Sequence, residues 1–506
     1  MTVLKLLENV KVKCRNGVPD AEIKGIAYDS RAVEKDFLFV AVKGFSVDGH
    51  DYIEDAVNRG AAAVIAEHAV EITGAGQSAI QNRAALIEVP DSREALALIS
   101  AAFYGHPSRR LSLIGITGTN GKTTTSFITK NIIDAGGEKT GLLGTIRYMT
   151  GDRTTAAFNT TPESLDLQSY LSEMVYNKVQ YAVLEVSSHA LALKRVEGCF
   201  FKVAAFTNFS QDHLDFHGTM DEYFRTKSKL FSCLDTGGTA VLNIDDPVIG
   251  PLAKKLDCNV ITCGIDKGAM IRAENISEQG AENREHGNSL PYGLSFDVRT
   301  PEGGFTVSSG LIGRFNVYNI LMSVGIAYAL GIGEDVIQQG IRNTMPVEGR
   351  FEKIDEGRDF LCIVDYAHTD DALRKLIEEA RSVSRGRVIT VFGCGGDRDR
   401  TKRPLMGAAA SELSDFVVVT SDNPRSEDPL LIMEEIVPGM KRNNYTLIPD
   451  REEAIMQAVS MAREGDIVLV AGKGHEDYQE IKGVRRHFSD REILRKAILK
   501  RSAISN

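Results

Sequence analysis

Residues 111–136 restrict the fold more than any other stretch of the sequence. The apolar run "LSLIGIT" is typical of a buried parallel strand, and "KTTTSFITKNIIDAG" is typical of a helix that ends at a glycine. The short loop between them begins at Gly118 and ends at Gly121. A strand that leads through a glycine loop into a helix is the arrangement of α/β domains that bind phosphate groups, so we expect that fold here.

The glycine loop departs from the usual phosphate-binding template. That template has a glycine separated from the Gly-Lys pair by four residues, and Ile116 stands at this position here. Backbone N–H groups at a strand-to-helix turn surround phosphate oxygens, and the helix dipole favours an anion. We therefore expect Lys122 to reach a terminal phosphate and Thr123 to ligate Mg²⁺. The alternative is a glycine turn that only connects a strand to a helix.

From about residue 346, apolar runs alternate regularly with helical stretches. This alternation predicts a parallel sheet wrapped on both faces, with ligands bound at the carboxyl edge of the strands. The expected strands are "FLCIVDYA", "RVITVFG", "FVVVTSD" and "DIVLVAGKG". The segments that follow them are polar, which favours a binding site at this edge: "DYAHTDD", "GCGGDRDR", "SDNPRSED" and "GKGHEDYQ".

The chain has 506 residues, which is more than one hydrophobic core accommodates. We predict an α/β protein with three domains. Residues 1–106 form a small N-terminal α/β domain, which ends at the polar joint "GHPSRR". Residues 107–345 form a central P-loop-type mononucleotide-binding domain with a parallel-rich sheet, in which "NISEQGAENREHGNS" is an exposed insertion or hairpin. Residues 346–506 form a Rossmann-like, doubly wound domain.

Charge and composition exclude several classes of protein. The net charge of -10 is spread along the chain and argues against a nucleic-acid scaffold, which normally has a basic face. The first residues, "MTVLKLLENVKVKCRNG", match neither a signal peptide nor a membrane span. The 7 cysteines are scattered, and we expect reduced, mostly buried thiols. These observations favour a cytoplasmic location without membrane insertion.

A second group of polar residues follows two apolar runs of the central domain. Glu185 closes "VQYAVLEV", and Asp212, His213, Asp215 and His217 follow "KVAAFTNFS". Carboxylate and imidazole groups at strand ends can hold a divalent metal. The alternative is that Asp212 caps a helix and the histidines fill a polar crevice. Because a nucleotide loop lies in the same domain, we favour metal binding.

Together, these motifs resemble the Mur ligase family, and in particular its members that add the third residue of the peptidoglycan stem peptide. The motifs span all three expected domains: "GITGTNGKTTT", "LEVSSHAL", "TNFSQDHLDFHGTMDEYFRTK", "GRFNVYN", "DYAHTDDAL", "GCGGDRDRTKRPLMG", "SDNPRSEDP" and "AGKGHEDYQ". The resemblance implies an ATP-driven ligase. The carboxylate of UDP-MurNAc-L-Ala-D-Glu becomes an acyl phosphate, which the amine of an incoming amino acid attacks. Three glycines spaced as in "GITGTNGK" are the family's form of the loop.

The resemblance also assigns residues to ATP and to Mg²⁺. The expected ATP-binding residues are Gly118, Thr119, Asn120, Gly121, Lys122, Thr123, Thr124, Asn316 and Arg350. The expected metal ligands are Thr123, Glu185, His213 and Lys227, the last as a carbamate (N6-carboxylysine). Lys122, His213 and Lys227 are the expected catalytic residues. Without the resemblance, Lys227 is typical of a lysine on a helix surface, and Asn316 and Arg350 of polar residues at a domain joint.

For the nucleotide substrate, the resemblance places the UDP part on the N-terminal domain. The expected contacts to UDP-MurNAc-L-Ala-D-Glu are Ser30, Asn159, Thr160, Thr161, Ser187 and Arg195. A monomer is expected, and no nucleic acid is expected as a partner.

The incoming amino acid is predicted to be meso-diaminopimelate and to bind the C-terminal domain. This molecule is lysine with a second carboxylate at its far end, so its pocket needs a forked cation, which a guanidinium supplies. The expected contacts are Arg398, Asp422, Asn423, Pro424, Arg425, Gly472 and Glu476. The family associates the tetrapeptide Asp-Asn-Pro-Arg with diaminopimelate. The alternative is that Asn-Pro only forms a turn and Arg425 is solvated, which explains the turn but not the arginine.

Several alternatives stay open at this stage. A lysine-adding tripeptide synthetase and a folylpolyglutamate-synthetase-like enzyme are ligases too, and Arg425 speaks against both. A nucleotide-dependent switch without ligase activity leaves the polar C-terminal strand ends unused. A non-catalytic partner protein with a decayed site is opposed by the presence of Lys122, Glu185, His213 and Lys227.

Overall fold

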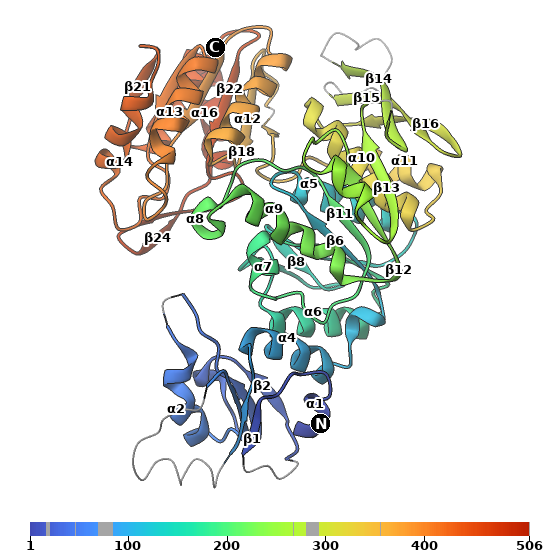
Figure 1. The fold of residues 1–506 in the computed structure, drawn as a ribbon. Coiled ribbons are helices and arrows are strands. Elements are labelled where there is room, and N and C mark those ends of the chain that lie inside the picture. Colours follow the sequence, from blue (N-terminus) through green and yellow to red (C-terminus); the bar gives the residue numbers. More distant parts are fainter. Residues whose placement is uncertain are drawn as a thin grey trace.

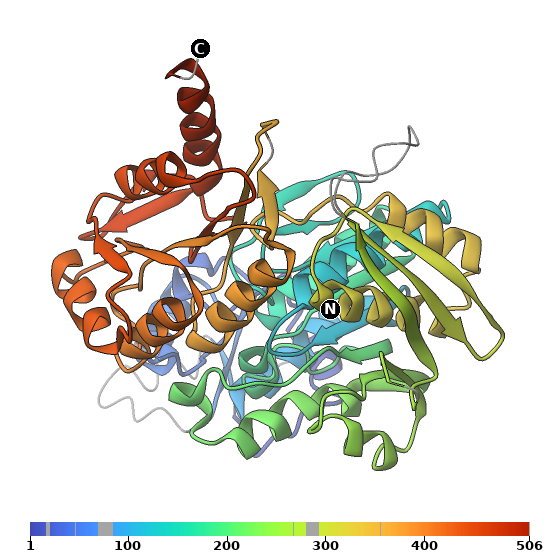
Figure 2. The same cartoon turned by 90° about the horizontal axis from the view of Figure 1, so that it is seen from above.

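The computed structural model describes residues 1–16, 21–45, 47–68, 84–266, 268–279, 293–354 and 356–504. Within these ranges, the strands form three sheets in successive parts of the chain, and a hairpin (Figure 1). Seen from above, the C-terminal sheet and its helices lie beside the central part, and the C-terminal helix α16 (Asp490–Ile504) projects outward (Figure 2). The α/β fold with three parts, predicted from the sequence, is confirmed.

The N-terminal sheet is mostly parallel, and only its edge strand β1 pairs antiparallel with β5. In spatial order its strands are β1 (Cys14–Asn16), β5 (Ala85–Glu88), β4 (Ala63–Ala66), β3 (Phe37–Val40) and β2 (Gly25–Ala27). Its α-helices are α1 (Val3–Leu6), α2 (Ile53–Asn58) and α4 (Ser92–Phe103), with the 3₁₀ turns η1 (Ser30–Ala32) and η2 (Gly49–Tyr52). The apolar run that forms β4 is buried on both faces, as expected of a strand inside a parallel sheet.

The central sheet has a parallel middle and antiparallel ends, so the predicted parallel-rich sheet is confirmed. In spatial order its strands are β16 (Gly303–Ser309), β15 (Gly293–Thr300), β14 (Ile271–Gln279), β13 (Asn259–Gly264), β12 (Leu234–Asn243), β11 (Phe201–Phe206), β6 (Ser112–Thr117), β10 (Tyr181–Glu185), β7 (Thr140–Leu143), β8 (Arg147–Met149) and β9 (Thr154–Ala156). The register pairs Ile116 of β6 with Glu185 of β10 and Ala205 of β11, so these three strands end together.

Helices cover both faces of the central sheet. The α-helices are α5 (Lys122–Ala135), α6 (Ser164–Tyr176), α7 (Ser188–Ala192), α8 (Leu214–His217), α9 (Met220–Ser228), α10 (Arg314–Ala329) and α11 (Glu334–Arg342). The 3₁₀ turns are η3 (Pro107–Arg109), η4 (Lys229–Cys233) and η5 (Gly250–Lys254). Ile128 of α5 and Ile320 of α10 belong to the buried apolar cluster on one face, and Leu167 of α6 belongs to the cluster on the other.

The C-terminal sheet is parallel except for its edge pair β17 and β18. In spatial order its strands are β17 (Glu352–Ile354), β18 (Leu361–Asp365), β22 (Ile467–Ala471), β19 (Val388–Phe392), β20 (Phe416–Val419) and β21 (Tyr445–Leu447). Its helices are α12 (Asp370–Val383), α13 (Lys402–Leu413), α14 (Pro429–Ile436), η6 (Val437–Gly439), α15 (Arg451–Met461) and α16, and β23 (Tyr478–Ile481) and β24 (Val484–His487) form the hairpin. Buried apolar clusters on both faces confirm the doubly wound arrangement.

Three smaller predictions have different outcomes. None of the 7 cysteines, all of which lie in the described residues, forms a disulfide, and Cys199, Cys263, Cys362 and Cys394 are buried, which agrees with the expected reduced thiols. In the predicted insertion, β14 pairs antiparallel with β15, while residues 280–292 lie outside the described residues. None of the described helices has the length and apolar character to span a bilayer.

Candidate active site

The loop between β6 and α5 makes contacts that only glycine permits. Gly118 and Gly121 have φ angles of +146° and +81°, which residues with side chains rarely adopt. A Cβ atom would lie 1.9 Å from Thr207 Oγ1 at the first position and 2.3 Å from Asn319 Oδ1 at the second. Both distances are far inside van der Waals contact, so two neighbouring polar side chains determine the glycine spacing.

Thr207 and Asn208, which follow β11 directly, hold the loop in place. Thr207 Oγ1 donates to the carbonyl oxygen of Asn120 at 2.6 Å. The Asn208 side chain accepts from the Asn120 N–H and donates to its carbonyl oxygen, at 2.9 Å each. The sequence analysis missed both residues. Their signal was a polar pair after an apolar run, but the sequence does not reveal that β11 lies next to β6.

Lys122 and Lys227 direct their ammonium groups to the same loop. Lys122 Nζ donates to the carbonyl oxygens of Gly118 and Thr119, at 2.9 Å each. Lys227 on α9 is buried, and its Nζ donates to the Gly118 carbonyl oxygen at 2.8 Å. Burial lowers the pKa of Lys122, and it lowers the pKa of Lys227 well below the usual value, with a further contribution from the charge of Lys122. The loop therefore holds two amines whose charged forms are disfavoured in the absence of an anion.

Glu185, at the end of β10, lies fully buried beside the start of α5. Its Oε2 accepts hydrogen bonds from Thr123 Oγ1 at 3.0 Å and from Thr145 Oγ1 at 2.9 Å, and its Oε1 accepts from the Thr145 N–H at 3.0 Å. The pairing of Glu185 with Ile116 explains why this carboxylate lies at the loop. A carboxylate beside a threonine hydroxyl provides oxygen ligands of the kind that Mg²⁺ prefers.

Asn316 and Arg350 approach the loop from two further segments. Asn316 on α10 accepts from Asn319 Nδ2 at 2.8 Å, and Asn319 Oδ1 in turn accepts from Thr125 Oγ1 at 3.4 Å. Arg350 Nη2 lies 3.5 Å from Thr123 Oγ1. Asn316 thus reaches the loop through Asn319, which was not predicted. The spacing of three residues in "NVYN" was the available signal, because it places both side chains on one helix face.

His213 lies at the start of α8 with a left-handed φ of +51°. Its Nε2 is 3.3 Å from Asp212 Oδ2, and its ring centroid is 4.8 Å from that of His189. Burial lowers the pKa of His213 to about 4, so the imidazole is neutral at pH 7. A neutral imidazole keeps a lone pair available for a metal ion or for a proton.

The predicted metal ligands are only partly in contact. Thr123 and Glu185 are hydrogen-bonded, and His213 lies within electrostatic range of Lys227. Where the structure is described, no group of three or more His, Cys, Asp and Glu side chains is placed to hold a metal ion. A magnesium ion that accompanies a nucleotide does not need such a group, because it takes most of its ligands from phosphate oxygens and water.

The residues expected to contact the muramoyl peptide lie together around the end of β10. Thr161 Oγ1 donates to the Glu185 carbonyl oxygen at 2.8 Å and accepts from the Ser187 N–H at 3.1 Å. Arg195 Nη1 donates to the Thr161 carbonyl oxygen at 3.0 Å. Thr160 Oγ1 lies 3.2 Å from Thr145 Oγ1, and the Asn159 N–H donates to Tyr148 OH at 3.0 Å.

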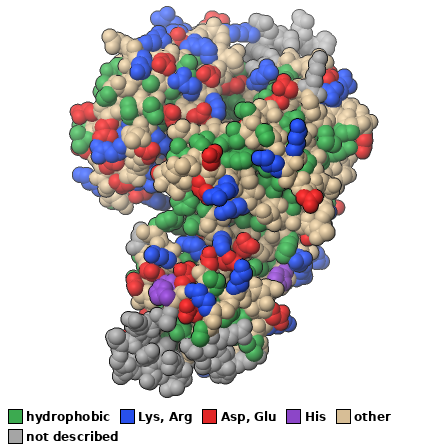
Figure 3. Space-filling model, viewed as in Figure 1, with side chains coloured by type: hydrophobic (Ala, Val, Ile, Leu, Met, Phe, Trp, Pro, Cys, Tyr) green, Lys and Arg blue, Asp and Glu red, His purple; other side chains and the backbone are tan. Residues whose placement is uncertain are grey.

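Ser30 is separated from this group, in the N-terminal part of the chain. It is buried in η1 and hydrogen-bonds to the Asp55 carboxylate, whose pKa it lowers. The two parts touch nearby, where Tyr28 OH donates to Asp166 Oδ2 at 2.8 Å. The surface in Figure 3 is indented between the N-terminal and C-terminal parts, on the left of that view.

Asn423 and Glu476 come from different loops at the carboxyl edge of the C-terminal sheet. Asn423 Nδ2 donates to Glu476 Oε2 at 2.8 Å. Lys473, which is fully buried, donates to Asn423 Oδ1 at 3.0 Å and lies 3.5 Å from Glu476 Oε2. Burial raises the pKa of Glu476, and the charge of Asp422 raises it further. Lys473 was missed, although it lies inside the motif "GKGHED".

Asp422 leaves one carboxylate oxygen free at the same edge. Its Oδ1 accepts from the Asn423 N–H at 2.7 Å, whereas Oδ2 is buried and finds no hydrogen-bond partner among the described residues. Gly472 has a φ of +118°, and a Cβ atom there would lie 2.6 Å from this Oδ2. The absence of a side chain at Gly472 therefore leaves room beside an acceptor that suits a positively charged group.

Arg398 and Arg425 lie on two loops that touch. Arg425 has a φ of +51°, and its Nη1 donates to the Gly396 carbonyl oxygen at 2.7 Å. Arg398 is exposed on the same loop as Gly396. A Cβ atom at Gly396 would lie 2.0 Å from the carbonyl oxygen of Pro424, so the two loops are in direct backbone contact. The structure thus brings all seven predicted C-terminal residues to one edge of the sheet.

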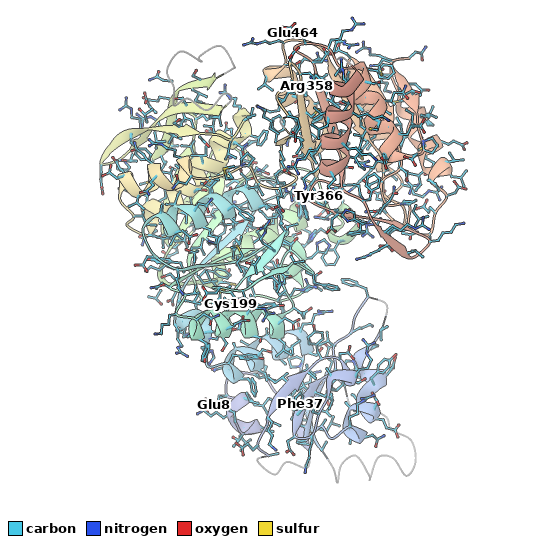
Figure 4. All side chains as sticks on the ribbon, turned by 180° about the vertical axis from the view of Figure 1, so that it is seen from behind. Glu8, Phe37, Cys199, Arg358, Tyr366 and Glu464 are labelled. Atoms are coloured by element: carbon cyan, nitrogen blue, oxygen red, sulfur yellow. The ribbon has the colours of Figure 1, made fainter. Side chains whose placement is uncertain are left out.

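Contacts link this edge to the nucleotide loop. The Arg350 guanidinium, near Thr123, lies 4.9 Å from the ring centroid of Tyr366, and the Tyr366 ring lies 5.0 Å from that of His475, the neighbour of Glu476. Tyr366 occupies the junction of the C-terminal and central parts in Figure 4. At a second contact, Lys402 Nζ on α13 lies 3.6 Å from Asp212 Oδ1. Two contacts, one between Arg350 and Tyr366 and one between Asp212 and Lys402, therefore lie where the two regions meet.

Comparison with family models covers most of the chain. The Mur ligase family, catalytic domain model matches residues 22–104, the Mur ligase middle domain model matches residues 116–327, and the Mur ligase, glutamate ligase domain model matches residues 349–474.

Similar proteins and structures share nearly the whole length. The chain is 45% identical over 506 residues to the UDP-N-acetylmuramoyl-L-alanyl-D-glutamate--2,6-diaminopimelate ligase of Bacillus licheniformis, covering 99% of each chain. It is 45% identical to the ligase of the same name from Solibacter usitatus, covering 98% of each. A solved structure of a ligase of that name has a TM-score of 0.66 at 31% identity, covering 99% of this chain and 100% of the other. The MurF ligase of Thermotoga maritima in complex with ADP, at 21% identity, has a TM-score of 0.63 over 97% of this chain and 100% of that one, which shows a shared fold.

Proposed function

Because the chain belongs to the Mur ligase family of ATP-dependent acid–amino-acid ligases, which act in peptidoglycan synthesis, we propose that it adds meso-diaminopimelate to UDP-MurNAc-L-Ala-D-Glu. The observation that carries this choice of amino acid is that Arg425 lies at the same sheet edge as two acceptors, the buried Asp422 Oδ2 and the half-buried Glu476 carboxylate. Relatives at 45% identity bear names that include 2,6-diaminopimelate, which supports the proposal.

In the proposed reaction, the D-Glu side-chain carboxylate attacks the γ-phosphorus of ATP, and the bond to the β-phosphate oxygen breaks to release ADP. The amine of the amino acid then attacks the acyl phosphate, loses a proton and expels phosphate. Carboxylate and triphosphate repel each other, so cations have to offset their charges. Lys122, whose ammonium group lies at the loop, and Arg350, whose guanidinium lies near Thr123, would bind phosphate oxygens.

The donor set fits Mg²⁺. Thr123 and Glu185 would hold one ion and His213 a second, and the neutral state of His213 at pH 7 suits a ligand. When bound, Mg²⁺ neutralises phosphate charge and polarises the phosphoryl group. The chain's own residues orient these donors, because Thr145 fixes both oxygens of Glu185.

Lys227 is proposed to carry a carbamate. Its buried amine and strongly lowered pKa favour the neutral form, whose lone pair attacks carbon dioxide while a proton is released. The product is an anion next to Lys122, so the carbamate and the Lys122 ammonium group attract each other, whereas two ammonium groups would repel.

The three expected domains then have separate roles. Residues 1–106 would bind the UDP part through Ser30, residues 107–345 would bind ATP and the muramoyl peptide, and residues 346–506 would bind the amino acid. The peptide contacts would be Asn159, Thr160, Thr161, Ser187 and Arg195, and the amino-acid contacts Arg398, Asp422, Asn423, Pro424, Arg425, Gly472 and Glu476. We propose that the enzyme acts as a monomer in the cytoplasm.

An amino-acid panel with the purified enzyme tests the proposal. With ATP and UDP-MurNAc-L-Ala-D-Glu, we expect rapid phosphate release with meso-diaminopimelate and far slower release with lysine, ornithine or glutamate. Equal rates with lysine would reverse the assignment of the amino acid. Phosphate release that continues when the amino acid is omitted would instead favour a nucleotide-dependent switch.

A further inference from the structure

We propose that Arg403 and Glu427 form a positioning pair that holds the two loops carrying Arg398 and Arg425, and so sets the affinity for the distal carboxylate of the amino acid. Both residues act through the loops and not on the substrate. The inference rests on the proposed function, because it takes diaminopimelate as the amino acid that Arg398 and Arg425 bind.

Arg403, near the start of α13, is 1% exposed and joins three segments. Its Nη1 and Nη2 donate to the two carboxylate oxygens of Glu427 at 2.9 and 2.8 Å. Nη1 also donates to Glu435 on α14 at 2.7 Å, and Nη2 donates to the Gly395 carbonyl oxygen at 3.3 Å. One planar guanidinium therefore links the loop after β19 with the loop after β20. Such bidentate pairs fix geometry as well as distance.

Glu427 makes the same connection from the other side. It follows the Asp-Asn-Pro-Arg tetrapeptide on the loop after β20, and its Oε1 accepts from the Asp397 N–H of the loop after β19 at 2.6 Å. Hydrogen bonds from Arg403 lower the pKa of Glu427 to about 2. The carboxylate is thus charged at neutral pH and keeps both loops bound to one ion pair.

The loops need such support because each holds one residue in an unfavourable conformation. Asp397 and Arg425 have φ angles of +52° and +51°, in the left-handed region that few residues other than glycine adopt. Ser426 stabilises this arrangement, since its Oγ donates to Asp397 Oδ1 at 2.5 Å. If the Arg403–Glu427 pair is broken, Asp397 and Arg425 can relax toward ordinary backbone conformations. Arg425, which neighbours Ser426, would then move relative to Arg398.

The same domain contains an ion pair that serves as a matched control. Arg387 donates to Asp466 Oδ2 through Nη2 at 2.7 Å and through Nε at 3.1 Å. This pair joins the amino-terminal ends of β19 and β22, at the opposite edge of the sheet from Arg425. Breaking this pair should therefore destabilise the domain without moving the two loops, which makes it a control for the effect of lost stability alone.

The test measures KM for meso-diaminopimelate, lysine and ATP in the full-length enzyme and in the variants Glu427→Gln, Arg403→Lys and Arg387→Gln. We expect Glu427→Gln to raise KM for diaminopimelate about tenfold, the effect of losing a charge-assisted hydrogen bond, while KM for lysine and ATP stays within about twofold. Arg403→Lys keeps the positive charge but loses the bidentate guanidinium. We expect it too to raise KM for diaminopimelate while KM for lysine and ATP stays nearly unchanged. Arg387→Gln should lower the melting temperature without a selective rise in KM for diaminopimelate.

Two results overturn the inference. The first is a Glu427→Gln variant whose KM for diaminopimelate is unchanged, and the second is a rise in KM that is equal for diaminopimelate, lysine and ATP. Both leave the proposed function intact, provided that the unaltered enzyme adds diaminopimelate. An unaltered enzyme that does not add it overturns the proposed function and this inference with it. If Glu427→Gln does not fold, Arg403→Lys carries the same comparison.

Discussion

Lys122 and Lys227 share one hydrogen-bond acceptor, the carbonyl oxygen of Gly118. Within the described part of the chain, neither ammonium group takes part in an ion pair with a carboxylate. Burial lowers the pKa of both lysines, which means that the folded chain disfavours their charged forms. Two amines that share one carbonyl oxygen, and whose charged forms the fold disfavours, form a site that a polyanion or a negatively charged modification stabilises.

Replacing Lys122 by alanine should abolish ATP-dependent ligation while the protein stays folded. Among the described residues, the side chain bonds to two carbonyl groups of its own loop and to nothing else, so its loss should shift the melting temperature by no more than about 4 °C. Phosphate release and a thermal melt measure the two effects. Lys130→Ala on the same helix is the control, since Lys130 forms an i,i+4 ion pair with Asp134, and this variant should leave both quantities unchanged. A collapsed melt for Lys122→Ala would mean that this lysine is structural.

Replacing Lys227 by alanine should abolish ligation in a way that short carboxylic acids partly reverse. If the lysine carries a carbamate, its removal leaves a cavity and a missing negative charge beside the loop, and formate or acetate can supply both. Ligation rates at increasing acetate concentration measure the recovery. Lys122→Ala is the control, because an anion cannot replace its cation. A Lys227→Ala variant that no carboxylic acid restores would argue against the carbamate.

The strands and the strand-end residues of the site were predictable because local patterns determine them. The apolar runs of β6, β10 and β11 identified buried strands, and polar residues directly after such runs, such as Glu185, identified the ligand edge. The glycine loop was predictable because the chain has to turn there without side chains, as Gly118 does against Thr207.

The contacts between distant segments were not predictable from one sequence. Asn208 holds the loop only because β11 lies beside β6, and periodicity does not specify the order of strands in a sheet. Arg403 has a charged side chain, and nothing in its local sequence indicates that it is buried between two loops. The roles assigned to Lys122, Lys227 and Arg425 stay predictions that substitutions at these residues test, and the domain boundaries stay predictions as well.

Replacing Arg425 by alanine should weaken the binding of diaminopimelate much more than that of ATP. A guanidinium bound to a carboxylate contributes about 3 kcal/mol, so KM for diaminopimelate should rise roughly a hundredfold. KM for ATP should change by less than about twofold, because Arg425 lies on the C-terminal loop and Lys122 on the central one. Arg374→Ala is the control, since this exposed arginine pairs with Glu412 on the neighbouring helix. Equal increases for both substrates would contradict the selectivity assigned to Arg425.

The unfolding free energy should depend on pH through Glu427. Hydrogen bonds from Arg403 lower its folded pKa to about 2 from the ordinary 4.5, so the unfolded chain binds more protons between these values. The stabilisation is therefore present above pH 4.5 and is lost as the pH falls toward about 2. Urea unfolding across this range should show a shallower pH dependence for Glu427→Gln than for the unaltered protein. If the unfolding free energy of both proteins depends on pH in the same way, Arg403 does not lower the pKa of Glu427.

Breaking the buried pair of Arg451 and Asp490 should destabilise the C-terminal part strongly. Arg451 donates to the two oxygens of Asp490 at 2.8 and 2.7 Å, and both side chains are 0% exposed. Asp490→Asn leaves an uncompensated buried cation and should cost about 3–5 kcal/mol of unfolding free energy. The guanidinium also donates to the carbonyl oxygens of Ser421 and Ala471, next to Asp422 and Gly472, so KM for diaminopimelate should rise as well.

Urea unfolding followed by circular dichroism measures the loss of stability. Asp371→Asn is the matched control, because Asp371 pairs with Lys375 on an exposed helix face and should cost no more than about 1 kcal/mol. The double variant Arg451→Met with Asp490→Leu should recover part of the stability, since apolar residues of similar volume remove the buried charge together with its partner. If Asp490→Asn costs as little as Asp371→Asn, water reaches Arg451 and the pair does not hold the ends of β20 and β22 together.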